Sequence, residues 1–133
     1  MKLINWFVDV FNVFCTKLLQ ISHNWDVKKG MFMNLWVDDI RLPPDETWYW
    51  VRTAKGAIKF LTAHHVKNWS LDHDLGWGGN GYKVILHLVE VKETTGFSLW
   101  PPEEPTLHTS NPVGRMNMRQ LLDRYAPYKA RRA

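Results

Sequence analysis

Short apolar runs alternate with longer segments of helical periodicity from residue 33 to the C-terminus. The runs 34–37, 48–51 and 66–71 have the length and the aromatic or β-branched content of strands. Apolar residues recur at helical spacing in the segments after residue 53, from 82 to 91 and after residue 111. Strands that alternate with helices form parallel sheets, so the pattern predicts an α/β fold.

Capping residues mark the ends of the expected helices. Thr53 is expected to cap the helix that follows the second strand, and Gly96 is expected to lie just past the end of the next helix. Asn111 and Pro112 are typical of a helix start, because asparagine accepts from free backbone N–H groups and proline fits the first helical position.

Two connections are rich in proline. Between the first and second strands, residues 38–47 contain Pro43 and Pro44, which exclude a regular helix. A parallel crossover normally needs a dozen or more residues, so we expect this connection to be tight. A second proline-rich segment, 101–105, leads into a short fourth strand predicted at 106–109. The expected architecture is a reduced parallel sheet of about four strands with flanking helices.

The first thirty residues differ in pattern from the rest. Between residues 3 and 21 the chain is largely apolar, and its polar residues fall in one helical stripe. Asp9 and Lys17 interrupt the run, which weighs against a membrane span, and the stripe lacks the basic face of an interfacial anchor. We predict an extra amphipathic helix in residues 1–30 that packs on the domain 31–133 or joins two copies of the chain.

A third interpretation of residues 1–30 concerns the start of translation. Lys28, Lys29 and Gly30 would be encoded by purine-rich codons just upstream of Met31 and Met33, and such codons could serve as a ribosome-binding site. On this hypothesis the evolved product begins at Met31 or Met33, and the preceding residues are an extension.

Length, charge and cysteine content narrow the class of protein. The 133 residues suit one domain, and five of the 17 basic residues lie in the last fifteen positions. No aromatic residues alternate with them as in single-strand binders, which favours a solvated helix face. The single cysteine, Cys15, excludes an intrachain disulfide and a multi-cysteine zinc site, and it indicates a reducing, cytoplasmic compartment.

Acidic residues follow two of the predicted strands directly. Asp38 and Asp39 come after the first strand, and Asp72-His73-Asp74 comes after the third. The carboxyl ends of parallel strands share one edge, so acids from two strands can converge on one cation. We predict that Asp38, Asp39 and Asp72 hold a divalent metal, Mg²⁺ or Mn²⁺ first, because both prefer oxygen ligands; the histidine leaves Zn²⁺ and Fe²⁺ open. The alternative is a solvated turn whose acids cap the backbone.

Two histidines are candidates for proton transfer. His73 lies between two carboxylates, and we expect Asp74 to fix its tautomer and orient it as an acid or base. His108 closes the fourth predicted strand, where the alternative is a buried histidine without a catalytic role.

The segment after His108 has the features of a phosphate-binding site. Ser110 and Asn111 precede a helix start, whose backbone N–H groups and dipole attract an anion. Arg115, one turn further on, can hold a phosphate with two hydrogen bonds, and Arg41 is a second candidate clamp.

Four ordered motifs carry a family resemblance: Leu-Trp-Val-Asp-Asp-Ile-Arg-x-Pro-Pro (35–44), Val-Arg-Thr-Ala (51–54), Ser-Leu-Asp-His-Asp-Leu-Gly (70–76) and His-x-Ser-Asn-Pro-Val-Gly-Arg (108–115). They resemble the cyclic-phosphate processing receiver-like domain, a divergent branch of the response-regulator receiver (flavodoxin-like) fold. The resemblance covers residues 33–126. It implies a receiver-like sheet, metal-binding acids and processing of cyclic phosphates on nucleotides or RNA ends.

The chain also departs from an ordinary receiver. No fifth strand ending in Lys-Pro follows the fourth, a proline loop replaces the usual first helix, and histidines occur where signalling receivers need none. These departures argue against classical phospho-switching. The leading hypothesis is a metal-dependent phosphoesterase for a cyclic phosphate. The alternatives are a non-catalytic module that binds such a phosphate and a degenerate receiver phosphorylated on Asp72.

Overall fold

A computed structural model describes residues 32–129 of the chain. These residues form four strands, three α-helices and one 3₁₀ turn, η1. In chain order they are β1 (Met33–Val37), β2 (Trp48–Val51), α2 (Ala54–Ala63), β3 (Val66–Leu71), η1 (Gly76–Gly78), α3 (Gly81–Thr95), β4 (Thr106–Leu107) and α4 (Pro112–Tyr125). All strand pairs are parallel, in the order β2-β1-β3-β4. The predicted α/β fold with a four-stranded parallel sheet is confirmed. The helix predicted in residues 1–30 lies outside the described residues.

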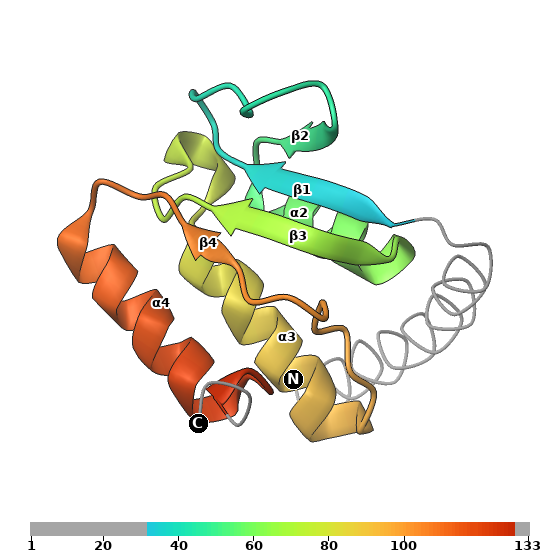
Figure 1. The fold of residues 1–133 in the computed structure, drawn as a ribbon. Coiled ribbons are helices and arrows are strands. Elements are labelled where there is room, and N and C mark those ends of the chain that lie inside the picture. The colour runs from blue at the N-terminus through green and yellow to red at the C-terminus, as the bar shows by residue number, and fades with distance from the viewer. Residues whose placement is uncertain (1–31, 130–133) are drawn as a thin grey trace, which may run out of the picture.

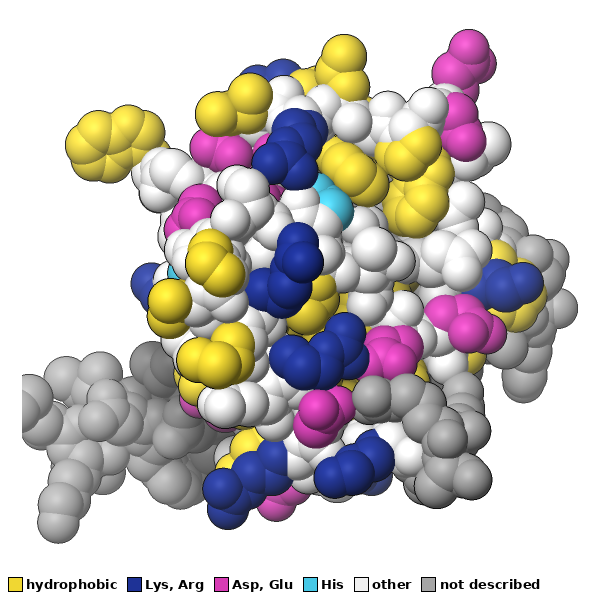
Figure 2. Space-filling model, turned by 60° about the vertical axis from the view of Figure 1, so that its left-hand side comes forward, with side chains coloured by type: hydrophobic (Ala, Val, Ile, Leu, Met, Phe, Trp, Pro, Cys, Tyr) yellow, Lys and Arg dark blue, Asp and Glu magenta, His cyan; other side chains and the backbone are white. Residues whose placement is uncertain are grey.

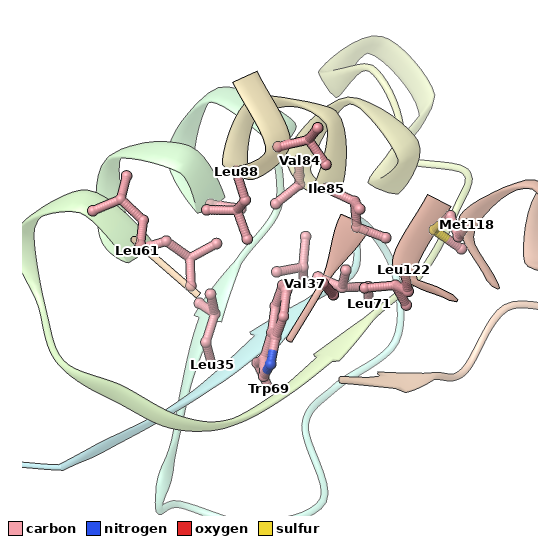
Figure 3. Close-up of a cluster of buried hydrophobic side chains, with 14 of the residues drawn as sticks. Leu35, Val37, Leu61, Trp69, Leu71, Val84, Ile85, Leu88, Met118 and Leu122 are labelled. Atoms are coloured by element: carbon pink, nitrogen blue, oxygen red, sulfur yellow. The ribbon is translucent and has the colours of Figure 1, made fainter. Parts of the chain in front are cut away.

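The three helices pack together and cover one face of the sheet (Figures 1 and 3). Alternate residues of β1, Leu35 and Val37, point into the core with Leu71 of β3. They meet apolar side chains from all three helices, including Leu61, Leu88 and Leu122. None of the described helices has the length and apolarity needed to cross a lipid bilayer.

The expected caps are present. The side chain of Thr53 accepts from the Gly56 amide at 2.9 Å, and that of Asn111 accepts from the Gly114 amide at 2.9 Å. Helix α3 runs to Thr95, further than the periodic segment 82–91, and ends at Gly96 in the left-handed conformation. Asn80, whose side chain accepts from the Lys83 amide, begins it.

The loop 38–47 replaces a crossover helix between β1 and β2. It lies over the sheet face opposite the helices, where two tryptophan indoles bond to its backbone. The Trp36 Nε1 donates to the Arg41 carbonyl at 2.9 Å, and the Trp50 Nε1 donates to the Asp38 carbonyl at 2.8 Å. The tight connection therefore holds its shape through side chains of the strands it joins.

Strand β4 is shorter than the predicted 106–109. The His108 amide still donates to the Leu71 carbonyl at 3.1 Å, but the chain then leaves the sheet. The carbonyl oxygens of His108 and Thr109 accept from the guanidinium groups of Arg41 and Arg115 and not from a further strand. These side-chain contacts turn the segment toward the carboxyl edge of the sheet.

Candidate functional site

Three residues occupy equivalent positions just past the carboxyl ends of neighbouring strands. The Asp38 amide donates to the Val51 carbonyl, the Asp72 amide to the Val37 carbonyl and the His108 amide to the Leu71 carbonyl. These bonds continue the ladders of β1, β3 and β4 by one residue each, and they place Asp38, Asp72 and His108 side by side.

The predicted acidic cluster forms at this edge. One carboxylate oxygen from each of Asp38, Asp39 and Asp72 lies within 4.8 Å of the other two. The donor set consists of oxygen only, which suits a hard cation such as Mg²⁺ or Mn²⁺. These residues therefore fit the divalent metal site expected from the sequence.

Asp38 is the most enclosed member of the cluster, with a side chain only 1% exposed. Its Oδ1 accepts from the backbone amides of Ile40 and Arg41, each at 2.9 Å. Burial raises the pKa of Asp38, but these two hydrogen bonds and the contact with His108 outweigh it, so the pKa lies below its usual value. Asp38 is therefore ionised and fixed in orientation.

His108 is held by two contacts of its ring nitrogens and by one stacking contact. Its Nε2 lies 2.9 Å from Asp38 Oδ2, and its Nδ1 lies 2.7 Å from Ser70 Oγ. The ring stacks on Trp36 with centroids 3.9 Å apart and an interplanar angle of 6°. Burial lowers the pKa of His108, and the hydrogen bond to Asp38 offsets this only in part.

The hydrogen bonds of His108 also assign its tautomer. A carboxylate only accepts, so Nε2 carries the proton that bonds to Asp38, and in the neutral ring Nδ1 accepts from the Ser70 hydroxyl. When Nδ1 gains a proton, it donates to Ser70 Oγ, and the hydroxyl can then donate to the Thr106 carbonyl at 3.2 Å. The surroundings of His108 thus accommodate both of its protonation states.

A hollow of about 360 Å³ opens beside the acidic cluster. Its lining includes the three clustered aspartates together with Arg41, Asp74, Gly76 and Ser110. Gly76 adopts a positive φ of 55°, and a Cβ at this position would lie 3.0 Å from Asp39 Oδ2. Glycine therefore gives the loop its left-handed turn and keeps space beside the carboxylate. We call this space the acidic hollow.

His73 lies on a different wall. Its Nδ1 is 2.9 Å from Asp74 Oδ1, as predicted for an oriented imidazole, but its ring packs against the first turn of α4. It lines a second hollow of about 550 Å³, together with Asn80 and Tyr82 of the α3 start and several α4 residues. Asp74 thus lines the acidic hollow, whereas His73 lines the second hollow.

The predicted phosphate-binding residues divide in the same way. Arg41 and Ser110 line the acidic hollow, whereas Arg115 lines an adjoining groove that shares Ser110 with it. Asn111 has a structural role, because its Oδ1 caps α4 and its Nδ2 reaches Asp74 Oδ2 at 3.2 Å. The hydrogen bonds from His73 and Asn111 lower the pKa of Asp74.

Two residues that hold His108, Trp36 and Ser70, were not predicted from the sequence. Strand periodicity contains part of the signal, because the two residues are paired in the β1–β3 register and point away from the core face. Their contact with His108 depends on the third neighbouring strand, which no local pattern specifies.

A parallel sheet with a pair of acids after its first strand and one aspartate after its third, converging at one edge, defines a receiver-type domain. Its acidic cluster is consistent with a divalent cation site. The chain belongs to the family of the cyclic-phosphate processing receiver domain, whose family model matches residues 33–124. The family predicted from the four motifs is confirmed. Comparisons with curated proteins and with solved structures find no match.

Proposed function

We propose that this domain is a metal-dependent phosphoesterase that opens a cyclic phosphate on a nucleotide or an RNA end. The observation that carries the proposal is the convergence of three aspartates in a hollow that also contains Arg41 and Ser110, with His108 bonded to Asp38. Membership of a family described as cyclic-phosphate processing supports the substrate class.

Asp38, Asp39 and Asp72 would hold Mg²⁺ or Mn²⁺. When bound, the ion supplies positive charge to the non-bridging phosphate oxygens and lowers the pKa of a coordinated water. Arg41 and Ser110, which line the same hollow, would bind the remaining phosphate oxygens, and Arg115 would approach from the adjoining groove.

Ring opening requires two proton transfers. An oxygen–phosphorus bond forms from the attacking water, which loses a proton, and one ring ester bond breaks, whose leaving oxygen gains a proton. We assign these transfers to His73 and His108, with Asp74 orienting His73. Neither ring lines the acidic hollow, so each would exchange its proton with the reactants through the carboxylate that it contacts. Both imidazoles are bonded to a carboxylate that lines the acidic hollow, each at 2.9 Å.

The test is incubation of the full chain with 2′,3′-cyclic nucleotides, 3′,5′-cyclic nucleotides and cyclic oligonucleotides in the presence of Mg²⁺, Mn²⁺ or Zn²⁺, with products separated by chromatography. We expect ring opening that is lost on chelation and in Asp72→Asn. Asp45→Asn is the matched control, since Asp45 lies on the exposed proline loop outside the acidic hollow.

Two outcomes would overturn the proposal. Retention of one cyclic nucleotide without turnover under any metal would make the domain a binding module. Stable labelling of Asp72 by a small phosphodonor, without hydrolysis of any cyclic phosphate, would make it a degenerate signalling receiver.

A further inference from the structure

A groove of about 570 Å³ runs between β4 and α4, next to the acidic hollow. Ser110 lines both spaces, so the groove adjoins the acidic hollow. The lining of the groove is mostly apolar and includes Leu107 and Met116, while its charged lining residues are Arg115 and Arg119. Within the described chain no acidic side chain lines it.

The groove lies along an open edge of the described sheet. Strand β4 is the last in the order β2-β1-β3-β4 and pairs only with β3. Figure 2 shows Lys and Arg side chains in succession on the face that carries this edge and α4, with hydrophobic side chains beside them. An extended ligand can therefore enter from the acidic hollow and leave at the far end of the groove.

Two arginines near Ser110 donate to backbone carbonyls. Arg41 donates to the His108 carbonyl at 2.7 Å, and Arg115 donates to the carbonyl of the next residue, Thr109. Both acceptors are neutral, so these bonds fix the guanidinium groups without neutralising them. Two fixed positive charges thus flank the passage from the acidic hollow into the groove.

Arg119 extends this series along α4. It lies four residues after Arg115, about 6 Å further along the helix axis and on the same side of the helix. Its guanidinium contacts the carboxylate of Glu104, and the carboxylate of Asp123 lies 4.0 Å away. Glu104 therefore partly neutralises the positive charge that Arg119 can offer to a ligand in the groove.

We propose that the groove binds the phosphodiester backbone of a single-stranded oligonucleotide whose terminal cyclic phosphate occupies the acidic hollow. Arg115 and Arg119, one turn apart on α4, match a ligand with repeated negative charges, and the apolar lining accepts its sugars. No aromatic side chain of the described chain lines the groove, so the groove recognises the backbone and not stacked bases. A mononucleotide would fill the acidic hollow and leave the groove empty. This inference rests on the proposed function, because it places the reacting phosphate in that hollow.

Binding can be measured without turnover. The probe is a 5′-fluorescent single-stranded RNA of about eight nucleotides with a linear 3′-phosphate, followed by anisotropy across a salt series. Arg119→Gln should weaken binding about three- to tenfold and reduce the salt slope by about 0.7. Glu104→Gln should tighten binding, because it releases the Arg119 guanidinium to the ligand.

Arg124→Gln is the matched control. It removes the same charge from the same helix, but Arg124 lines the second hollow with His73 and not the groove. Binding by this variant should equal that of the wild type. Opposite effects of the changes at Arg119 and Glu104 cannot come from a general loss of stability, since both changes break the same ion pair.

Turnover separates the inference from the proposed function. Oligonucleotides ending in a cyclic phosphate should react with a higher kcat/KM than the corresponding mononucleotide, and Arg119→Gln should remove only this advantage. If Arg119→Gln weakens and Glu104→Gln tightens RNA binding but no cyclic phosphate is opened, the groove is an RNA-binding site and the phosphoesterase proposal fails. Equal affinity of all variants for the RNA overturns the groove assignment. Turnover that is independent of oligonucleotide length would also overturn it. Dimerisation of the wild type that Arg119→Gln abolishes would overturn it too, because a second copy of the chain would then occupy the groove.

Discussion

His108 is bonded to Asp38 across the carboxyl edge of the sheet, with Nε2 2.9 Å from Oδ2. The contact joins residues 70 positions apart, and it connects the end of β4 to the most buried carboxylate of the acidic cluster. His73 stands in the same relation to Asp74, with Nδ1 2.9 Å from Oδ1. In two imidazole–carboxylate pairs, the carboxylate thus lines the same hollow.

His108→Ala should lower turnover of a cyclic phosphate by about 10²–10⁴-fold, the usual contribution of an acid or base. His108→Gln distinguishes proton transfer from positioning, because its amide can still donate to Asp38 but cannot exchange a proton. We expect the glutamine variant to be as inactive as the alanine variant. Circular dichroism should show both folded. Activity of the glutamine variant within about tenfold of wild type would make His108 a positioning residue for Asp38.

Gly114 is predicted to be intolerant of any side chain. A Cβ there would lie 2.3 Å from Cγ of the His73 ring. Glycine to alanine in a helix ordinarily stabilises by about 0.5–1 kcal/mol, but here we expect a loss of about 1–3 kcal/mol in the free energy of unfolding because the ring must move.

A double-mutant cycle tests the cause of that loss. In a His73→Ala background the obstructing ring is gone, so Gly114→Ala should become neutral or stabilising. Urea denaturation of the four proteins gives the coupling directly. An unchanged cost of Gly114→Ala in the His73→Ala background would mean that another contact opposes the methyl group.

The sequence predicted those parts of this fold whose signals are local. Thr53 and Asn111 cap their helices because each side chain reaches an amide three residues ahead, a contact contained within four residues. The convergence of Asp38 and Asp72 followed from parallel strands with a shared edge. These predictions needed only periodicity, capping chemistry and one rule of sheet topology.

Other parts depend on contacts between distant segments. The expected strand at 106–109 ends at Leu107. Beyond it, the carbonyls of His108 and Thr109 accept hydrogen bonds from Arg41 of the 38–47 loop and Arg115 of α4. His73 faces α4 because the helix packs close enough at Gly114 to receive its ring. Neither outcome is encoded in the segment that shows it.

Two tryptophans should respond differently to truncation. Trp69 is 1% exposed in the core, and its indole N–H donates to the Glu103 carbonyl at 2.7 Å. Trp77, on the glycine-rich turn η1, is fully exposed. Trp69→Ala should lower the free energy of unfolding by about 3–5 kcal/mol, and Trp77→Ala should change it by no more than about 0.5 kcal/mol. Chemical denaturation measures both, and a large effect at Trp77 would show that its side chain packs in solution.

Stability should fall as the pH is lowered from about 7.5 to 5.5. Burial lowers the pKa of His87 on α3 below its ordinary value of 6.5, and the nearby charge of Glu90 offsets this only in part. Between the folded and unfolded pKa values the unfolded chain binds more protons, so acidification favours unfolding. His108, whose pKa is also lowered, adds to the same trend.

His87→Gln isolates the contribution of one histidine to this pH dependence. The variant cannot take up the proton that the unfolded wild-type chain binds below pH 6.5, so its urea midpoint should fall less between pH 7.5 and 5.5. A residual slope should remain from His108, and it should shrink again in the double variant with His108→Gln. The window stays above the range in which Asp38 titrates, because the pKa of Asp38 is lowered from its ordinary value. Identical slopes for wild type and His87→Gln would mean that the half-buried His87 ring is as well hydrated in the folded chain as in the unfolded one, since burial is what lowers its pKa.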